Sequence, residues 1–387
     1  MTRTAAIGVS VLLLACAGEA GRNDTGSTVT NVAGVLHVNL RSLPPERVPQ
    51  LHAEEVFTTA ARHELFHVTA ARFLEGGDLA LANAGTSEIL VLDASGALAH
   101  RSGGSGEGPG EFAWISALDV DTSGNILVYD PRQGRLTRMT VDGSVIETRP
   151  LSPPNRIVDL QPLAELNDGR IAAVYADLRV FAAGGEARDT IPLMLFDADG
   201  ARADTLGMWP ATEWAFIAIP RGASRSPVGF GGSAAYAGRN GRFAIGSTDT
   251  LDVVVYGADG ELEMRIAGGV RAEVDPADVE RWRQDVLASR SQAPEELRRA
   301  LADVPYRSTY PAFADLALDD AGRIWIGSYA RPAAVERDWI VIGTDGAVDG
   351  RLTLPASSRI LDIAGDRIAV LSRDALDEEY VSVHRLM

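Results

Sequence analysis

The sequence predicts an all-β fold, a six-bladed β-propeller with a short helical insertion between its fourth and fifth blades. Short runs in which apolar and polar residues alternate recur along the chain, as expected of half-buried strands. Turns rich in Asp, Asn and Gly separate these runs, because Asp and Asn bond to their own backbone and Gly accepts a positive φ. Four such runs repeat at a period of roughly 40–50 residues, which is typical of propeller blades.

The N-terminus has the pattern of a secretory signal peptide in residues 1–15. Arg3 precedes a short apolar run that ends with Leu-Leu-Ala-Cys at residues 13–16. This run is about half of the roughly 20 residues that a membrane-spanning helix needs. The four residues resemble the lipobox of bacterial lipoproteins, which implies that Cys16 is lipidated and anchors the protein to a membrane of the cell envelope. An ordinary secretory signal with an incidental cysteine is the alternative.

The composition excludes some partners and some kinds of stabilisation. All 36 basic residues are arginine, and 53 acidic residues give a formal net charge of −17. Such a surface repels phosphate backbones, so we expect no nucleic-acid partner. Because the only cysteine is at position 16, no disulfide can form within the domain.

Residues 16–53 are expected to form the lipidated cysteine and a flexible tether. Up to about residue 33 the segment is rich in small and polar residues and has no periodicity. Pro44, Pro45 and Pro49 argue against a regular element in the remainder. We therefore expect the propeller domain to occupy residues 54–387.

The repeat is clearest in the second and fifth units, at residues 117–146 and 314–346. Six units are predicted, beginning near the following residues: His63, Glu111, Ile157, Gly232, Pro311 and Ser358. The sixth unit has room for only three strands. We expect residues 54–60 to supply its fourth strand and so to close the ring, as each blade packs against its neighbours.

A family resemblance supports this interpretation. Gly-Ser-Gly-Glu-Gly-Pro-Gly-Glu-Phe at residues 104–112, followed by the strand pattern of residues 117–143, resembles an NHL-type repeat. From about residue 54 to the C-terminus the chain is similar to bacterial six-bladed β-propeller lipoproteins of largely uncharacterised function. The fourth blade departs from that pattern by carrying long insertions.

One insertion, at residues 275–304, is predicted to be helical. Asp275 is a suitable N-cap, and Pro276 follows at the first helical position. Apolar residues then recur at helical spacing. A second helix is expected to start at Pro294, and Pro305 ends the run.

Residues 63–67, His-Glu-Leu-Phe-His, match the H-E-x-x-H pattern of zinc proteases. That chemistry needs a helix with both histidines on one face, Glu64 as general base and a third ligand, for which Glu88 is conceivable by spacing. On a strand, His63 and His67 would stand about 13 Å apart, too far for one zinc ion. The propeller pattern continues directly after the motif and favours a strand, although the surrounding residues include good helix formers. We therefore expect no metal ligand here and no cofactor.

The longest links between blades suggest a binding site. Links from the outer strand of one blade to the inner strand of the next lie on one face of a propeller, so residues 101–111, 208–231 and 270–310 should surround the same mouth of the central channel. Loops on a rigid scaffold often carry binding residues. The candidate contacts are the aromatic residues of the second and third links: Trp209, Trp214, Phe216, Phe230 and Trp282. Packing within the long loops is the alternative role for these rings.

We expect a non-catalytic, lipid-anchored extracytoplasmic propeller that binds a protein, peptide or glycan at this mouth. Because one fold serves many functions, two alternatives remain. The first is a metal-dependent hydrolase or lyase, since six-bladed propellers include lactonases and lyases with a metal in the channel. Four carboxylates lie near predicted inner strands: Glu111, Asp159, Asp315 and Asp362. The second alternative is a purely structural component of the envelope.

Overall fold

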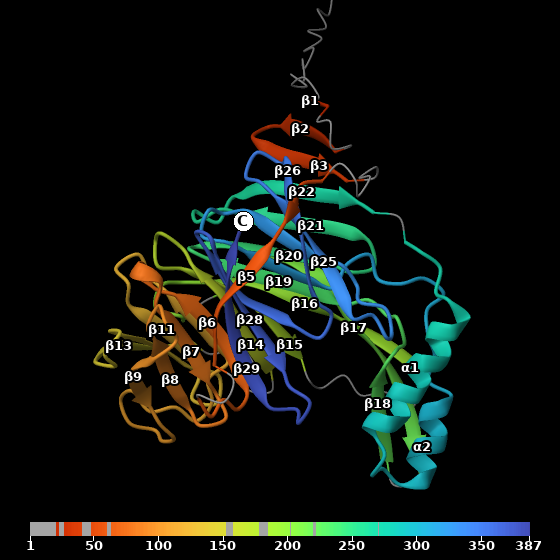
Figure 1. Ribbon diagram of the computed structural model, residues 1–387. Helices are drawn as coiled ribbons and strands as arrows, with labels where there is room; N and C mark the ends of the chain where they lie inside the picture. The colour runs from red at the N-terminus through yellow and green to blue at the C-terminus, as the bar shows by residue number, and fades with distance from the viewer. Residues whose placement is uncertain are drawn as a thin grey trace, which may run out of the picture.

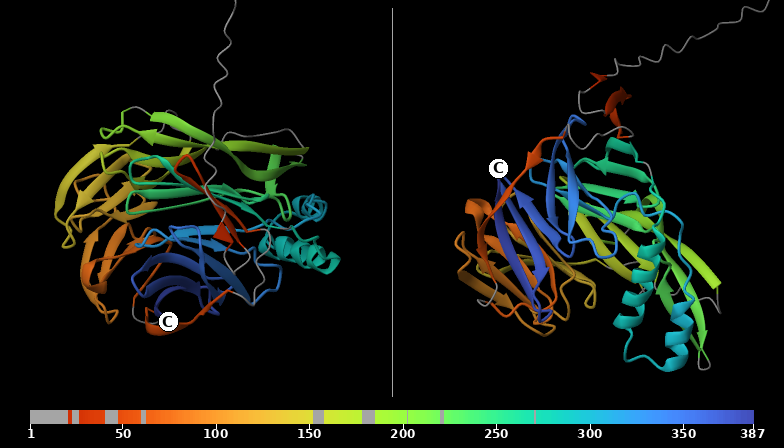
Figure 2. Two further views of the ribbon diagram at one scale, coloured as in Figure 1. Left: turned by 90° about the horizontal axis from the view of Figure 1, so that it is seen from above. Right: turned by 45° about the vertical axis from the view of Figure 1, so that its right-hand side comes forward.

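The computed structural model describes the following residues: 21–22, 27–40, 48–59, 63–151, 158–177, 185–201, 203–219, 222–269 and 271–387. These residues form six sheets arranged around a central channel, and the protein is a six-bladed β-propeller (Figures 1 and 2). The predicted signal peptide, residues 1–15, and Cys16 lie outside the described residues.

The first two blades are four-stranded antiparallel meanders whose first strand lies beside the channel. The first blade contains β6 (Val68–Phe73), β7 (Leu79–Asn83), β8 (Glu88–Leu92) and β9 (Leu98–Gly103), with a short 3₁₀ helix at Glu75–Gly77. The second contains β10 (Ala117–Val120), β11 (Ile126–Asp130), β12 (Arg135–Met139) and β13 (Val145–Pro150). Residues 119–124, Asp-Val-Asp-Thr-Ser-Gly, form the end of β10 and its turn to β11.

The third and fourth blades carry the additions to the basic pattern. The third contains β14 (Val158–Glu165), β15 (Ile171–Asp177), β16 (Gly185–Phe196), β17 (Ala203–Ile219) and β18 (Gly222–Pro227). The core of the fourth contains β19 (Ala234–Arg239), β20 (Arg242–Ser247), β21 (Leu251–Tyr256) and β22 (Leu262–Gly268).

The fifth and sixth blades complete the ring. The fifth contains β23 (Asp315–Leu318), β24 (Ile324–Gly327), β25 (Glu336–Ile342) and β26 (Val348–Pro355). The sixth contains β27 (Arg359–Ala364), β28 (Arg367–Arg373), β29 (Glu379–Leu386) and β5 (Ala53–Thr58). β5 pairs antiparallel with β29, as predicted for the closing strand. Its Phe57 is buried in the core between the sixth and first blades, in contact distance of Gly96.

Part of the segment expected to be a flexible tether is regular structure. β2 (Thr28–Val32) and β3 (Val35–Asn39) form a hairpin, and β1 (Gly21–Arg22) pairs with β2. The hairpin turns at Ala33 and Gly34, both with positive φ, as two-residue hairpin turns require. β3 pairs in parallel with β22 and widens the fourth blade, while β4 (Gln50–Leu51) adds to β26 of the fifth. Burial of Val38 in the core supplies the driving force.

The predicted helical insertion is present between the fourth and fifth blades. α1 (Pro276–Ser289) starts after Asp275, whose side chain accepts a hydrogen bond from the Ala277 amide at 2.8 Å. α2 (Glu295–Ala302) follows. Both helices pack on the β17–β18 hairpin, at residues 214–227, and we call these three elements the arm. The arm projects from the propeller at the end of the molecule opposite to β1–β3 (Figures 1 and 2).

The arm corrects one expectation. Residues 208–231 were expected to form a loop, yet most of them lie in β17 and β18. These strands extend beyond the blade because the helices cover one side of them, with Ala215 and Val228 buried against Leu301 and Val304. This long-range apolar contact is the physical reason for the ordered hairpin.

The main core lies between neighbouring blades. Between the fifth and sixth blades, for example, Trp325 and Trp339 pack against Ile363 and Ile368. Both rings are almost fully buried and belong to the inter-blade packing. Among the described residues, no helix combines the length and hydropathy that crossing a bilayer requires.

Candidate functional site

The inner strands of five blades begin around one cavity of about 590 Å³, which we call the mouth cavity. Five of its polar lining residues lie on an inner strand or just before one: Thr69, Ser116, Gln161, Tyr236 and Arg359, from blades one, two, three, four and six. Because every outer strand ends where the next inner strand begins, the links between blades lie on this same face. The helical insertion belongs to one of these links.

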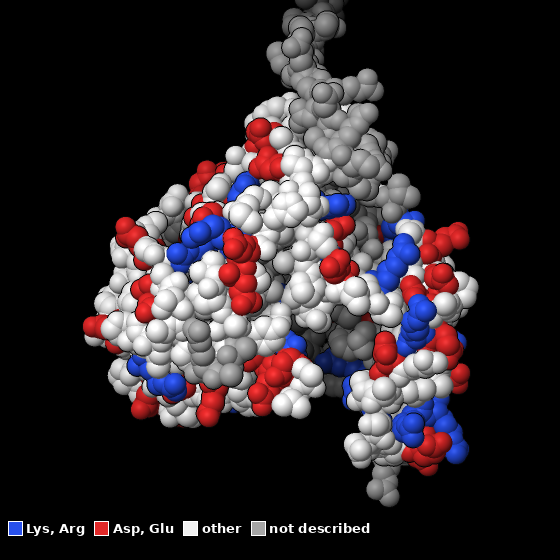
Figure 3. Space-filling view, in the orientation of Figure 1, with Lys and Arg blue, Asp and Glu red and all other residues white. Residues whose placement is uncertain are grey.

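An outer cavity of about 700 Å³ adjoins the mouth cavity and shares His67, Arg373 and Glu379 with it. Its other lining residues include four carboxylates: Glu64, Asp374, Asp377 and Glu378. Figure 3 shows acidic side chains at the lower edge of the propeller, beside a hollow that separates this edge from the arm. The outer cavity is therefore acidic overall.

Arg359 gives the inner part of the site a positive charge. Its guanidinium donates a hydrogen bond to the Val68 carbonyl at 2.7 Å, and no described carboxylate lies within 4.0 Å of it. The side chain is exposed to the cavity but surrounded by protein. Burial lowers the pKa of Arg359, and the charges of Glu379 and Asp315 offset this only in part. Arg359 remains a cation that has most of its five N–H donors available.

Two neutral side chains that line the same cavity as Arg359 have few partners within the protein. The hydroxyl oxygen of Ser116 is buried and has no hydrogen-bond partner among the described residues. The amide nitrogen of Gln161 reaches only the carbonyls of Ser116 and Pro162, both at 3.5 Å, which is long for a hydrogen bond. Both groups can therefore bond to a ligand in the mouth cavity.

Arg72 crosses the channel below the mouth cavity. It donates to Gly238 of the fourth blade at 2.8 Å, to Leu361 of the sixth at 3.2 Å, and to Asp119 of the second at 3.0 Å. Burial opposes its charge, but Asp119 and Asp362 outweigh this and raise the pKa of Arg72. Only about 180 Å³ of open space remains around this crossing, so the mouth cavity ends at a floor of bonded side chains.

Asp362, one of the carboxylates named for a metal-dependent enzyme, is enclosed by positive groups. Its side chain is 1% exposed and forms an ion pair with Arg239. It also accepts from the Phe73 amide at 2.7 Å and lies 3.8 Å from Arg72. Both carboxylate oxygens of Asp362 therefore already have partners within the protein.

Two of the other named carboxylates have partners of their own. Asp315 forms an ion pair with Arg337, and Glu111 accepts from the Gly108 amide at 2.9 Å within its own loop. The side chain of Asp159 is outside the described part of the chain. In the described ranges, no three His, Cys, Asp or Glu side chains are grouped so that they could hold one metal ion.

The His-Glu-Leu-Phe-His motif at residues 63–67 is neither helix nor strand, since β6 starts at Val68. His63 is hydrogen-bonded to the Gly96 carbonyl at 3.0 Å. The His67 ring lies 4.3 Å from Phe66 and 5.9 Å from Trp114, between ring centres, at the edge of the mouth cavity. The strand start expected at His63 is thus displaced, and the two imidazoles, which both line the outer cavity, have different partners.

The aromatic residues selected from the sequence lie in or beside the arm. Phe230 is 3% exposed, and its ring centre is 5.8 Å from that of Trp282 and 5.4 Å from that of Tyr310. Trp209 packs against the interface between the third and fourth blades. None of these rings lines the mouth cavity.

The remaining two candidates are also engaged within the arm. Phe216 is buried, and the guanidinium of Arg225 lies over the Trp214 ring at 4.4 Å. A role in ligand contact stays a prediction for the selected aromatic residues. The polar residues of the mouth cavity were missed by sequence reasoning, because each lies in a different repeat.

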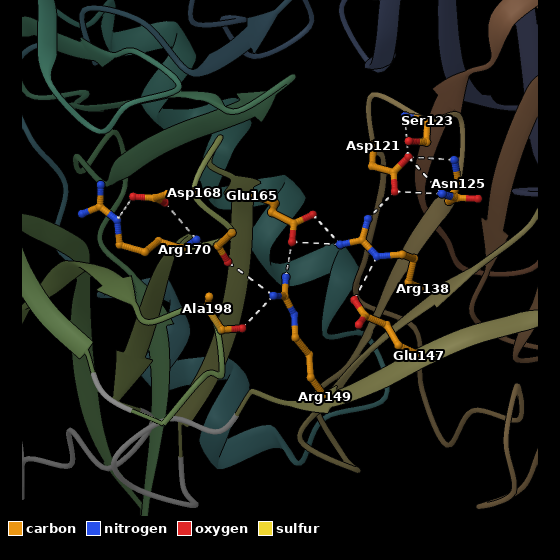
Figure 4. Close-up of polar contacts among 11 residues, drawn as sticks. Asp121, Ser123, Asn125, Arg138, Glu147, Arg149, Glu165, Asp168, Arg170 and Ala198 are labelled. Atoms are coloured by element: carbon orange, nitrogen blue, oxygen red, sulfur yellow. Dashed lines mark hydrogen bonds and ion pairs between the residues drawn. The ribbon is translucent and has the colours of Figure 1, made fainter.

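A second polar cluster lies at the opposite face, between the second and third blades (Figure 4). Arg138 bonds to Glu147 at 2.9 Å, to Glu165 at 3.0 Å and also to Asp121. Arg149 bonds to Glu165 as well. Burial opposes ionisation of Asp121, but hydrogen bonds from Asn125, Ser123 and Arg138 outweigh it and lower the pKa of the carboxyl. We call this cluster the Arg138 network, and it joins two blades.

Comparisons with known proteins agree with the fold. A family described as a 6-bladed beta-propeller has a model that matches residues 59–162. No curated protein matches the sequence. A member of the duf4221 family from Bacteroides vulgatus is similar in structure at 13% identity, with 88% of this chain and 97% of that chain covered and a TM-score of 0.46.

Two further solved structures are similar at lower scores. Regucalcin, a calcium-binding protein from Agrobacterium tumefaciens, is 13% identical over 87% of this chain and 94% of that chain, with a TM-score of 0.41. Virginiamycin B lyase from Staphylococcus aureus is 10% identical over 94% and 93%, with a TM-score of 0.37. The family match and the six sheets together identify the chain as a six-bladed β-propeller.

Proposed function

We propose that this protein is a non-catalytic binding module, a lipid-anchored extracytoplasmic propeller that takes a protein, peptide or glycan into its mouth cavity. The observation that carries the proposal is the cavity itself, about 590 Å³ with Arg359 at its wall and Arg72 crossing the channel below. Its volume is typical of ligand sites. Its polar groups come from several blades, so the rigid ring holds them in place.

Binding is favoured over catalysis because the acidic groups near the channel are already bonded. Asp362 is held by Arg239, and Asp315 by Arg337. Glu379 accepts from the Val68 amide at 2.8 Å and pairs with Arg373 at 2.7 Å. A carboxylate whose oxygens already bond inside the protein is poorly placed to exchange a proton with a ligand.

The position of the N-terminal strands suits a membrane anchor. β1–β3 and the arm lie at opposite ends of the molecule (Figures 1 and 2). A lipid at Cys16, which precedes β1, would leave the arm and the mouth face directed away from the membrane. Labelling cells with a fatty-acid analogue tests the anchor. We expect label in the wild type and none in Cys16→Ser, and equal labelling would refute lipidation.

A cavity-filling substitution tests the binding site. The purified wild-type protein is screened against a peptide library and a glycan array. The affinity of each binder is then measured for the wild type and for Ser116→Trp. This ring would fill the mouth cavity, whereas Ser123→Trp changes an exposed turn at the opposite face and is the matched control. We expect binding to fall at least about ten-fold in Ser116→Trp alone, both variants being checked by thermal unfolding. A screen without binders, or binders that tolerate Ser116→Trp, contradicts the proposal.

A further inference from the structure

We infer that the mouth cavity is a carboxylate-binding site, in which Arg359 receives the free C-terminal carboxylate of a peptide that also carries a cationic side chain. This inference rests on the proposed function and names its ligand. A guanidinium offers two parallel N–H donors that match the two oxygens of a carboxylate, and such paired bonds are among the strongest in proteins.

Arg359 differs from the other arginines beside the channel. Arg72, Arg239 and Arg337 each form an ion pair with an aspartate. Arg359 instead has one hydrogen bond to a backbone carbonyl and no carboxylate within ion-pair distance among the described residues. It is therefore the arginine of this group that can accept an external anion without losing an internal ion pair.

Two further side chains that line the mouth cavity can donate hydrogen bonds to a carboxylate. The unpartnered hydroxyl of Ser116 and the weakly bonded amide of Gln161 line the same cavity and can donate to it. Glu379, the carboxylate nearest to this wall, does not take the place of the ligand because its oxygens bond to Arg373 and the Val68 amide. The mouth cavity thus combines the cation of Arg359 with neutral donors from two other blades.

The outer cavity indicates what else the ligand carries. Its four carboxylates, at Glu64, Asp374, Asp377 and Glu378, line the space that adjoins the mouth cavity. They repel a polyanion and attract a cation, so charge complementarity favours a ligand whose carboxylate points inward and whose positive group remains outside. A peptide with a free C-terminus and a basic side chain has this arrangement, whereas an acidic glycan has repeated negative charges.

Paired peptides provide the test. The probes are a set of arginine-containing tripeptides, each prepared as the free acid and as the C-terminal amide, with glucuronate and glucose as the sugar pair. Binding to the purified protein is measured by calorimetry. We expect the free acids to bind at least about ten-fold more tightly than the amides. Arg359→Gln should remove this difference, and Arg359→Lys should keep part of it. Arg132→Gln, which changes another arginine of the mouth face, should have no effect.

The outcomes separate this inference from the proposed function. If acids and amides bind the wild type equally, or if Arg359→Gln keeps the preference, the carboxylate assignment is overturned while binding at the mouth stands. If glucuronate binds through Arg359 and the peptides do not, the peptide assignment is overturned. If the peptide and glycan screen finds binders but none of these probes binds, the inference fails alone. Unchanged thermal unfolding of Arg359→Lys shows that a loss of binding does not come from misfolding.

Discussion

The Arg138 network and the mouth cavity use the same side chain in opposite ways. Arg138 meets three carboxylates from two blades, and Arg149 adds a second link to Glu165 (Figure 4). Arg359, on the other face of the ring, meets one backbone carbonyl. The guanidinium of Arg138 bonds to groups within the protein, whereas most N–H donors of Arg359 remain available to a ligand.

The electrostatic environment follows the same division. Burial opposes the charge of Arg138, yet its hydrogen bonds to Glu147 and Asp121 and the charge of Glu165 raise its pKa. Around Arg359 burial is the larger effect and lowers the pKa. Paired arginines at one face join blades, whereas an unpaired arginine in a cavity of the other face is a candidate for recognition. Four predictions test this contrast.

The largest effect is expected where an arginine pair is most deeply buried. Arg239→Met removes the ion-pair partner of Asp362, whose side chain is 1% exposed. We expect a loss of about 3–5 kcal/mol in the free energy of unfolding, because the buried carboxyl of Asp362 loses its direct ion-pair partner and keeps only Arg72, 3.8 Å away, and the Phe73 amide. Urea unfolding measures this loss. If Arg239→Met with Asp362→Leu is as unstable as Arg239→Met alone, the unpaired charge is not the cause.

Arg138→Met should have an intermediate effect. It leaves Asp121, Glu147 and Glu165 without their shared donor, although each carboxylate keeps some exposure to water. We expect about 2 kcal/mol of destabilisation in urea unfolding at low salt. A loss below about 0.5 kcal/mol would show that the network contributes no more than an ordinary surface ion pair.

Acid should weaken the same network. Because the pKa of Asp121 is lowered in the folded state, its contribution to stability is present above the ordinary aspartate pKa of about 3.9 and is lost as the pH falls through the folded value. Asp121→Asn should therefore lose less stability than the wild type as the pH falls from about 5 to about 2. The upper limit of this range lies about one unit above the ordinary aspartate pKa. Asp285→Asn, on the exposed face of α1, is the control and should follow the wild type. Identical acid profiles for all three proteins contradict this role of Asp121.

Local patterns were sufficient to predict the blades. Alternating apolar runs and Asp-Gly turns act over a few residues, so the six repeats and the helical insertion could be read directly. The closing strand β5 was predictable because the sixth repeat was one strand short. The N-terminal hairpin and the β17–β18 hairpin of the arm were missed, since each owes its order to contacts with distant segments, such as the parallel pairing of β3 with β22.

The mouth cavity shows why the site was harder to predict. Five polar residues of this cavity lie on inner strands or just before them, each more than 40 residues from the next along the chain: Thr69, Ser116, Gln161, Tyr236 and Arg359. Each is an ordinary polar residue of its own repeat, and only the closed ring brings them together. The prominent aromatic residues Trp282 and Phe230 attracted attention instead, and they pack at the base of the arm.

The smallest effect on stability should come from Arg359→Met. Removing this guanidinium breaks one hydrogen bond to Val68 and leaves no described carboxylate without an ion-pair partner. The loss of the cation is also partly offset, since burial already disfavours the charge at this position. We expect a change of at most about 0.5 kcal/mol in urea unfolding, as for most exposed substitutions.

A loss comparable to that of Arg138→Met would place Arg359 among the structural arginines and would remove the contrast between the two faces. Near-native stability together with lost binding of free-acid peptides would instead assign Arg359 to recognition, because a structural side chain cannot be removed without a cost in folding.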